Sequence, residues 1–132
     1  MPVQLEMVLR LLLAAALGAI IGFQREHVGK PAGVRTLGLI SAGSAMFSVI
    51  SILSFPGGDP SRVAAGVVTG IGFLGAGAIL HRHGGVEGLT TAATIWVAAG
   101  IGLASGAGLY IIAPVVTAIA LILLLLPHKD IK

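Results

Sequence analysis

The chain alternates long apolar stretches with short polar segments, and this pattern predicts a helical membrane protein. A helix needs about 20 residues to cross a bilayer core about 30 Å thick. Five stretches come close to that length, namely residues 5–23, 36–55, 63–80, 89–105 and 109–126. The apolar runs are continuous and too long for the roughly ten-residue strands of an outer-membrane barrel. We therefore expect an all-α fold in which residues 1–132 form one compact bundle of five transmembrane helices.

The charges between these spans predict the orientation of the bundle. Lys and Arg are retained on the cytoplasmic side of bacterial membranes. Most basic residues lie in the first loop, the third loop and the tail: Arg25, Lys30, Arg35, Arg82, Lys129 and Lys132. The second loop holds Arg62 alone, so we expect the N-terminus outside and the C-terminus inside. This orientation argues against a cleaved signal peptide at residues 11–21, because a signal peptide enters with its N-terminus inside.

Composition supports a membrane location and excludes several function classes. Hydrophobic residues make up 56% of the chain and charged residues 10%, whereas a soluble domain has about 25% charged residues. The net charge is +3, but the basic residues are scattered and aromatics are 5%, which argues against nucleic-acid binding. The chain has no cysteine, so disulfides, thiolate metal sites and a Cys nucleophile are excluded.

Glycines on the helices predict where backbones touch. Membrane helices associate through small residues that allow close approach. At about 100° per residue, Gly66, Gly70 and Gly77 share one side of the third span and Gly72 and Gly75 the other, so we expect this helix to be central. The residues expected in helix packing or oligomerisation are Gly18, Gly22, Gly66, Gly70, Gly72, Gly75 and Gly77.

The segment 70–75 also matches the dinucleotide-binding pattern GxGxxG. That pattern works at a turn between a strand and a helix, where backbone N–H groups meet pyrophosphate. Here it lies inside an apolar run whose backbone hydrogen bonds must be satisfied within the helix. We therefore interpret these glycines as packing residues and expect no cofactor.

Two spans carry polar faces. One hydroxyl stripe consists of Ser41, Ser44, Ser48 and Ser51, and a second face consists of Thr90, Thr94, Ala98, Gly102 and Ser105, with Thr91 at its edge. We weigh two interpretations: close packing with interhelical hydrogen bonds, or a polar lining for a solute path or a docking groove. Trp96 lies on the opposite side of the fourth span, where we expect a packing anchor, with contact to a partner as the alternative.

Asp, Glu, Lys, Arg and His are absent from 11–23, 36–55, 63–80 and 89–126. Proton relays and magnesium sites need ionisable or carboxylate groups at depth, so we do not expect an independent ion pump. No nucleophile and base are placed together, so we do not expect an enzyme. His81 and His83 stand two apart in a loop without a third strong ligand, and we expect no metal site.

The remaining polar residues lie at helix ends. Glu6 and Arg10 stand four apart on one face near the start of the first span, where both charges can be accommodated. Asp59 followed by Pro60 predicts an N-cap with proline at the first helical position. Pro114 predicts a kink low in the fifth span. In the segment 24–35 we expect lipid headgroup contacts or a specific binding surface, with Glu26 paired to Lys30 if the first helix continues.

Five ordered blocks resemble a known family. They are residues 22–26 (GFQRE), 30–36 (KPAGVRT), 59–65 (DPSRVAA), 70–77 (GIGFLGAG) and 88–96 (GLTTAATIW). Together they resemble the transmembrane domain of the MgtC/SapB family over residues 12–117. The chain departs from the family at Gln24, where Glu is usual, at Gly66, where Gln is usual, and at Glu87, where a basic residue is usual.

The resemblance implies a bacterial inner-membrane protein linked to low magnesium and to virulence, which regulates other membrane proteins such as the F-type ATP synthase. It assigns partner binding to the cytoplasmic residues Arg25, Glu26, Lys30, Arg35 and Thr36, and an external loop to Asp59 and Arg62. We expect a non-enzymatic regulator that contacts lipid and forms a homo-oligomer, most simply a dimer, or binds other inner-membrane proteins. The alternative is a small transporter or channel for Mg²⁺ or another solute. Many relatives carry a C-terminal cytoplasmic domain, which we do not expect here.

Overall fold

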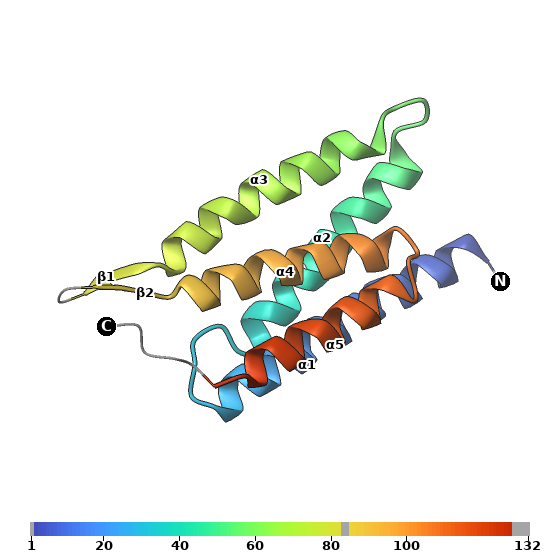
Figure 1. Ribbon diagram of the computed structural model, residues 1–132. Coiled ribbons are helices and arrows are strands. Elements are labelled where there is room, and N and C mark those ends of the chain that lie inside the picture. Colours follow the sequence, from blue (N-terminus) through green and yellow to red (C-terminus); the bar gives the residue numbers. More distant parts are fainter. Residues whose placement is uncertain (1, 83–84, 128–132) are drawn as a thin grey trace.

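The computed structural model describes residues 2–82 and 85–127, and residues 80–82 and 85–87 are described by their backbone alone. Over these residues the chain forms five helices and a short hairpin (Figure 1). The helices are α1 (Val3–His27), α2 (Val34–Ser54), α3 (Pro60–Ala78), α4 (Leu89–Gly106) and α5 (Ile112–Leu125). The first four are long and apolar enough to cross a membrane, which confirms the predicted helical membrane fold for four of the five spans.

The fifth helix is shorter than the sequence predicts. α5 has 14 residues, or about 21 Å at 1.5 Å per residue, because residues 107–111 form the turn after α4. The predicted kink at Pro114 is wrong, since Pro114 lies in the first turn of α5. A proline is tolerated there because the N–H groups of the first turn have no partner within the helix.

A two-stranded hairpin follows α3. Strand β1 (Leu80–Arg82) pairs with β2 (Gly85–Glu87) in antiparallel register, with Leu80 opposite Glu87. The sequence predicts a helix end and a loop here. The hairpin was missed because a strand of three residues is too short to show an alternation of apolar and polar positions. Gly88 is the residue just before α4, and its φ of +93° is a conformation that favours glycine.

The core lies between α1, α2 and α4. Ile21, Leu37 and Ile101, one from each of these helices, are fully buried. In an apolar 18-residue stretch of α4, 50% of the residues are buried, compared with 6% of the residues in the corresponding stretch of α3. The expectation that the third span is central is therefore wrong: Figure 1 shows α3 diverging from α2 at the edge of the bundle.

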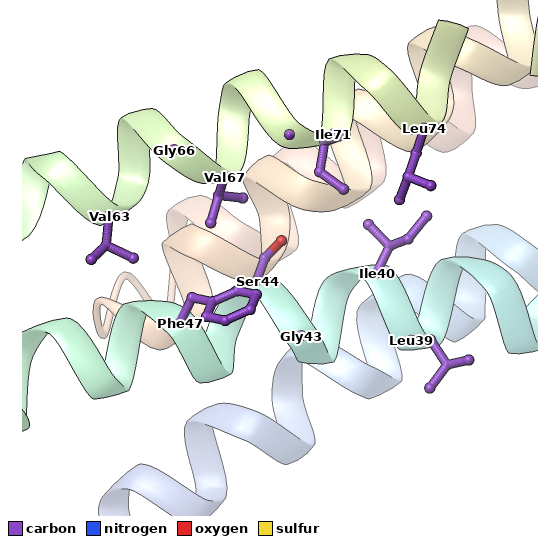
Figure 2. Close-up of a pocket in the computed structure, with 11 residues that line it drawn as sticks. Leu39, Ile40, Gly43, Ser44, Phe47, Val63, Gly66, Val67, Ile71 and Leu74 are labelled. Atoms are coloured by element: carbon purple, nitrogen blue, oxygen red, sulfur yellow. The ribbon is translucent and has the colours of Figure 1, made fainter. Parts of the chain in front are cut away.

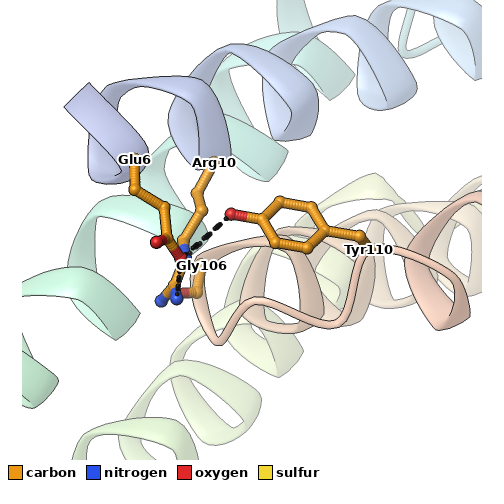
Figure 3. A network of polar contacts seen from close by, with 4 residues as sticks. All are labelled: Glu6, Arg10, Gly106 and Tyr110. Atoms are coloured by element: carbon orange, nitrogen blue, oxygen red, sulfur yellow. Dashed lines mark hydrogen bonds and ion pairs between the residues drawn. The ribbon is translucent and has the colours of Figure 1, made fainter. Parts of the chain in front are cut away.

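A polar cluster joins the start of α1 to the turn after α4 (Figure 3). The Arg10 guanidinium lies 2.5 Å from a Glu6 carboxylate oxygen, so the two residues that stand four apart on one face of α1 form an ion pair. Arg10 also donates to the Gly106 carbonyl at 2.9 Å and to the Tyr110 hydroxyl at 3.2 Å. These bonds satisfy the charge at this end of the bundle and hold α1 against α4.

Candidate functional site: the helix contact surfaces

Two glycines bring α1 into backbone contact with α2. A Cβ atom at Gly18 would lie 2.5 Å from the Leu37 carbonyl oxygen, and one at Gly22 would lie 2.5 Å from the carbonyl carbon of Gly33. Real Cβ atoms do not approach other atoms so closely. Because the two glycines stand four residues apart, they lie on one face of α1 and leave no room for side chains.

A second glycine pair brings α4 into backbone contact with the same face of α2, since Ser41 meets both Gly18 and Gly102. A Cβ atom at Gly102 would lie 2.7 Å from the Ser44 Cβ, and one at Gly106 would lie 2.6 Å from the Ala45 carbonyl oxygen. The sequence places Gly102 on the polar face of the fourth span, for which close packing is one of the two interpretations, but it does not single out Gly106. Their four-residue spacing, the same as that of Gly18 and Gly22, was the signal available.

The serine stripe of α2 faces this contact. Ser41, Ser44 and Ser51 are buried, and Ser48 and Ser51 donate weakly, at 3.4 Å, to the carbonyls of Leu103 and Pro60. On α4, Thr94 and Ser105 donate to carbonyls of their own helix. The Ser41 hydroxyl oxygen is buried and has no hydrogen bond within the described chain. The serine stripe thus touches α4 at Gly102 and Gly106, and a cavity of about 390 Å³ lies beside Ser48 and Ser51, between α2, the start of α3 and the end of α4.

Trp96 does not act as a packing anchor within the chain. It is 56% exposed on the outer surface of α4. The expectation of an intramolecular anchor is therefore wrong, and the alternative of contact with a partner stays a prediction. Thr90 is exposed whereas Thr91 is buried, so only part of the predicted threonine face is available at the surface.

Arg25 is buried rather than displayed on a loop. It is 3% exposed, and its guanidinium donates to the Thr91 hydroxyl and, at 3.2 Å, to the Pro31 carbonyl. A charged group taken out of water must be compensated by hydrogen bonds. Arg25 therefore links α1, the first loop and α4, and this position does not suit direct contact with a partner.

Glu26 binds the start of α2 rather than Lys30. Its carboxylate accepts a hydrogen bond at 2.8 Å from the N–H of Val34, the first residue of α2, where negative charge is favourable. The predicted Glu26–Lys30 pair is wrong, since α1 ends at His27 and the two side chains no longer share a helix. Lys30, Arg35 and Thr36 are exposed and stay available to lipid or a partner.

The 55–59 loop contains the predicted N-cap. The Asp59 carboxylate accepts a hydrogen bond from the Ser61 N–H at 2.9 Å, and Pro60 is the first residue of α3. The N-cap prediction is confirmed. The Ser61 N–H holds the pKa of the Asp59 carboxyl below its usual value. The neighbouring Arg62 is exposed.

The glycines of α3 behave differently from those of α1 and α4. Only Gly75 packs inside the chain, where its Cβ would lie 3.6 Å from the Ala92 carbonyl oxygen. At the other four positions a Cβ would meet no atom of the described chain within 4 Å: Gly66, Gly70, Gly72 and Gly77. These four glycines therefore make no close approach within the bundle.

Two surfaces of α3 are left open. One faces α2 across a groove of about 620 Å³ (Figure 2), lined from α2 by Leu39, Ile40, Gly43, Ser44 and Phe47 and from α3 by Val63, Gly66, Val67, Gly70, Ile71 and Leu74. We call it the α2–α3 groove. The other is the outer face, formed by the exposed small residues Ala65, Thr69, Gly72 and Ala76, which fall within about 60° of arc at about 100° per residue.

No metal centre is found in the part of the chain that the structure describes, since no three His, Asp or Glu side chains there gather into a cation site. His83, Lys129 and Lys132 lie outside the described residues. The side chains of His81, Arg82 and Glu87 belong to the segment described by its backbone alone.

Comparison with known proteins adds to this geometry. The sequence pattern of the MgtC family matches residues 11–129. The chain is 50% identical over 113 residues to the "Putative magnesium transporter YhiD" of Escherichia coli strain K12, covering 80% of this chain and 53% of that protein. It is 48% identical over 101 residues to "Protein MgtC" of Salmonella typhimurium strain LT2, covering 76% of this chain and 43% of that protein. It is 43% identical over 123 residues to a protein of Haemophilus influenzae strain Rd, covering 86% of this chain and 52% of that protein.

The chain thus spans about half the length of the curated relatives it matches. No solved structure matches it.

Proposed function

Because the chain belongs to the MgtC family and has four helices able to cross a membrane, we propose that it is a regulatory protein of the bacterial inner membrane, oriented N-out and C-in. It catalyses no reaction. It acts by helix-to-helix contact, on a second copy of itself or on another inner-membrane protein, in adaptation to low magnesium. The magnesium link rests on the name of the relative YhiD and on the family.

The observation that carries this proposal is the outer face of α3. Ala65, Thr69, Gly72 and Ala76 are all exposed, and a Cβ at Gly72 would meet no described atom within 4 Å. Lipid tails are as apolar as leucine, so membrane helices gain from association mainly where small residues let backbones approach. The same residue types are buried where α1 and α4 meet α2, and the outer face of α3 offers an equivalent surface to a partner.

The alternative function is transport of Mg²⁺ or another solute, which the name of the relative YhiD favours. Transport would require a polar path. Gly102 and Gly106 of α4 pack against Ser41, Ser44 and Ser48 of the serine stripe, so a path along these residues would require the two helices to separate. Flux into reconstituted liposomes that disappears when Ser44 and Thr94 both become Val would favour transport over regulation.

Crosslinking in native membranes tests the proposed contact. The chain has no cysteine, so Ala76→Cys provides a single reactive site on the outer face. We expect a crosslinked dimer or complex, and its loss when Gly72→Leu is added. Leu123→Cys on the exposed surface of α5 is the matched control and should give no specific product. Recovery of monomer alone from Ala76→Cys, or equal yields at both sites, would contradict the proposal.

A further inference from the structure

We propose that the α2–α3 groove binds one phospholipid, with an acyl chain lying between the helices and the phosphate at Arg35. The lipid comes from the leaflet on the side of the α1–α2 loop. This inference uses the groove and leaves the outer face of α3 free, so it does not depend on the proposed function.

The lining of the groove suits a hydrocarbon chain. Ten of its eleven lining residues are aliphatic, aromatic or glycine, and the exception, Ser44, is only 3% exposed. Gly43, Gly66 and Gly70 stand on its walls, and a Cβ at each would meet no described atom within 4 Å. An occupant therefore contacts hydrocarbon and backbone surface, and space remains along both walls.

The groove is open at the end where a lipid headgroup would lie. The 55–59 loop joins α2 to α3 at one end, and the helices diverge from it toward the other end (Figure 1). Thr36 lies one turn before the lining residue Ile40. The wall of α2 extends about 16 Å from Thr36 to Phe47, at about 1.5 Å per residue. This length matches one leaflet, which is half of a bilayer core about 30 Å thick.

Charge complementarity identifies the occupant. Arg35 is exposed at the open end of the groove, one turn before the lining residue Leu39. Among the residues whose side chains the structure describes, the only ion pair joins Arg10 to Glu6, so none of their carboxylates neutralises Arg35. A guanidinium binds phosphate oxygens in bidentate geometry, and Thr36 beside it offers a hydroxyl. A cation at the mouth of an apolar groove matches a phospholipid, whereas a second apolar helix has no group for this charge.

The test uses a phosphatidylglycerol analogue with a photoreactive diazirine in one acyl chain, added to vesicles of phosphatidylethanolamine and phosphatidylglycerol that contain the protein. We expect crosslinks concentrated on the lining residues of α2 and α3. Gly66→Leu with Gly70→Leu, or Gly43→Leu on the opposite wall, should abolish them. Arg35→Gln should remove the preference for phosphatidylglycerol over phosphatidylethanolamine. Gly72→Leu on the outer face is the matched control and should retain the label.

Two results would overturn the proposal. Crosslinks spread evenly over α3 and α5, and unchanged by the filling variants, would mean that only bulk lipid covers the groove. A disulfide-linked dimer formed by Val67→Cys in the same vesicles would mean that a second copy occupies it. Thermal unfolding of each variant shows whether it is folded. The test is decided by the variant that remains folded, either Gly43→Leu or Gly66→Leu combined with Gly70→Leu. Loss of lipid label with outer-face crosslinking intact would separate this proposal from the proposed function.

Discussion

Gly102 of α4 faces Ser44 of α2 so closely that a Cβ atom at Gly102 would lie 2.7 Å from the Ser44 Cβ. The backbones of the two helices are in contact at this point, next to the contact with α1, since Ser41 of α2 meets both Gly18 and Gly102. A polar stripe in a membrane helix can therefore belong to a dry contact, because serine is small enough to let a neighbouring helix approach.

Gly18 and Gly102, which contact α2, should tolerate substitution by larger residues far less well than Gly66 and Gly70, which meet open space. Gly102→Val or Gly18→Val forces α2 away from its neighbour, and overpacking of this kind costs about 1–3 kcal/mol. Gly66→Ala and Gly70→Ala meet open space and replace glycine by a better helix former, a gain of about 0.5–1 kcal/mol. Thermal unfolding in bicelles measures the difference. Equal losses at positions 66 and 102 would contradict the packing described here.

Arg25 and Thr91 should be energetically coupled. Thr91→Val removes the acceptor of a buried guanidinium, and hydrogen bonds to charged groups contribute about 1.5–3 kcal/mol. Arg25→Gln also removes the bond to Pro31. The double variant should lose less stability than the sum of the two single variants, measured by unfolding in the same bicelles. Strict additivity would mean that the two residues do not act together. Thr90→Val, at an exposed neighbouring position, is the control.

The Asp59 cap predicts a dependence of stability on acid. Because the Ser61 N–H lowers the pKa of the folded carboxyl, the charged cap stabilises α3 above the unfolded pKa, and this contribution is lost as pH falls through the lower folded pKa. Asp59→Asn keeps a capping oxygen but cannot titrate, so the stability difference between the two proteins should change only in acid. Unfolding temperatures measured from neutral pH downward test this. An unchanged difference at low pH would mean that Asp59 is not the titrating group.

The sequence predicts where helices form better than which faces meet. Hydrophobic run length locates α1 to α4 within a few residues, because a bilayer sets the length of a spanning helix. The glycines of α3 cannot be distinguished by sequence from those of α1, since small residues permit close approach without specifying a partner. Gly18 meets α2, whereas Gly72 meets nothing in the described chain.

The polar residues at the end of α1 show the same limit. Arg25 lies beyond the predicted first span, so the sequence favours a surface position. The structure buries it because α1 continues to His27 and Thr91, remote in sequence, supplies an acceptor. The outcome at Asp59 was predictable, since an N-cap depends only on residues next to it.

Water access to Ser41 most directly tests whether these helix faces make contact or line a path. Ser41 is fully buried between Gly18 and Gly102, and Ser41→Cys is the only thiol in the chain. We predict that a membrane-impermeant thiol reagent applied to either side of native membranes leaves it unmodified, while Thr36→Cys at the exposed start of α2 reacts. Rapid modification of Ser41→Cys, together with Ser44→Cys and Ser48→Cys along the same stripe, would contradict the contact account and indicate a water-filled path.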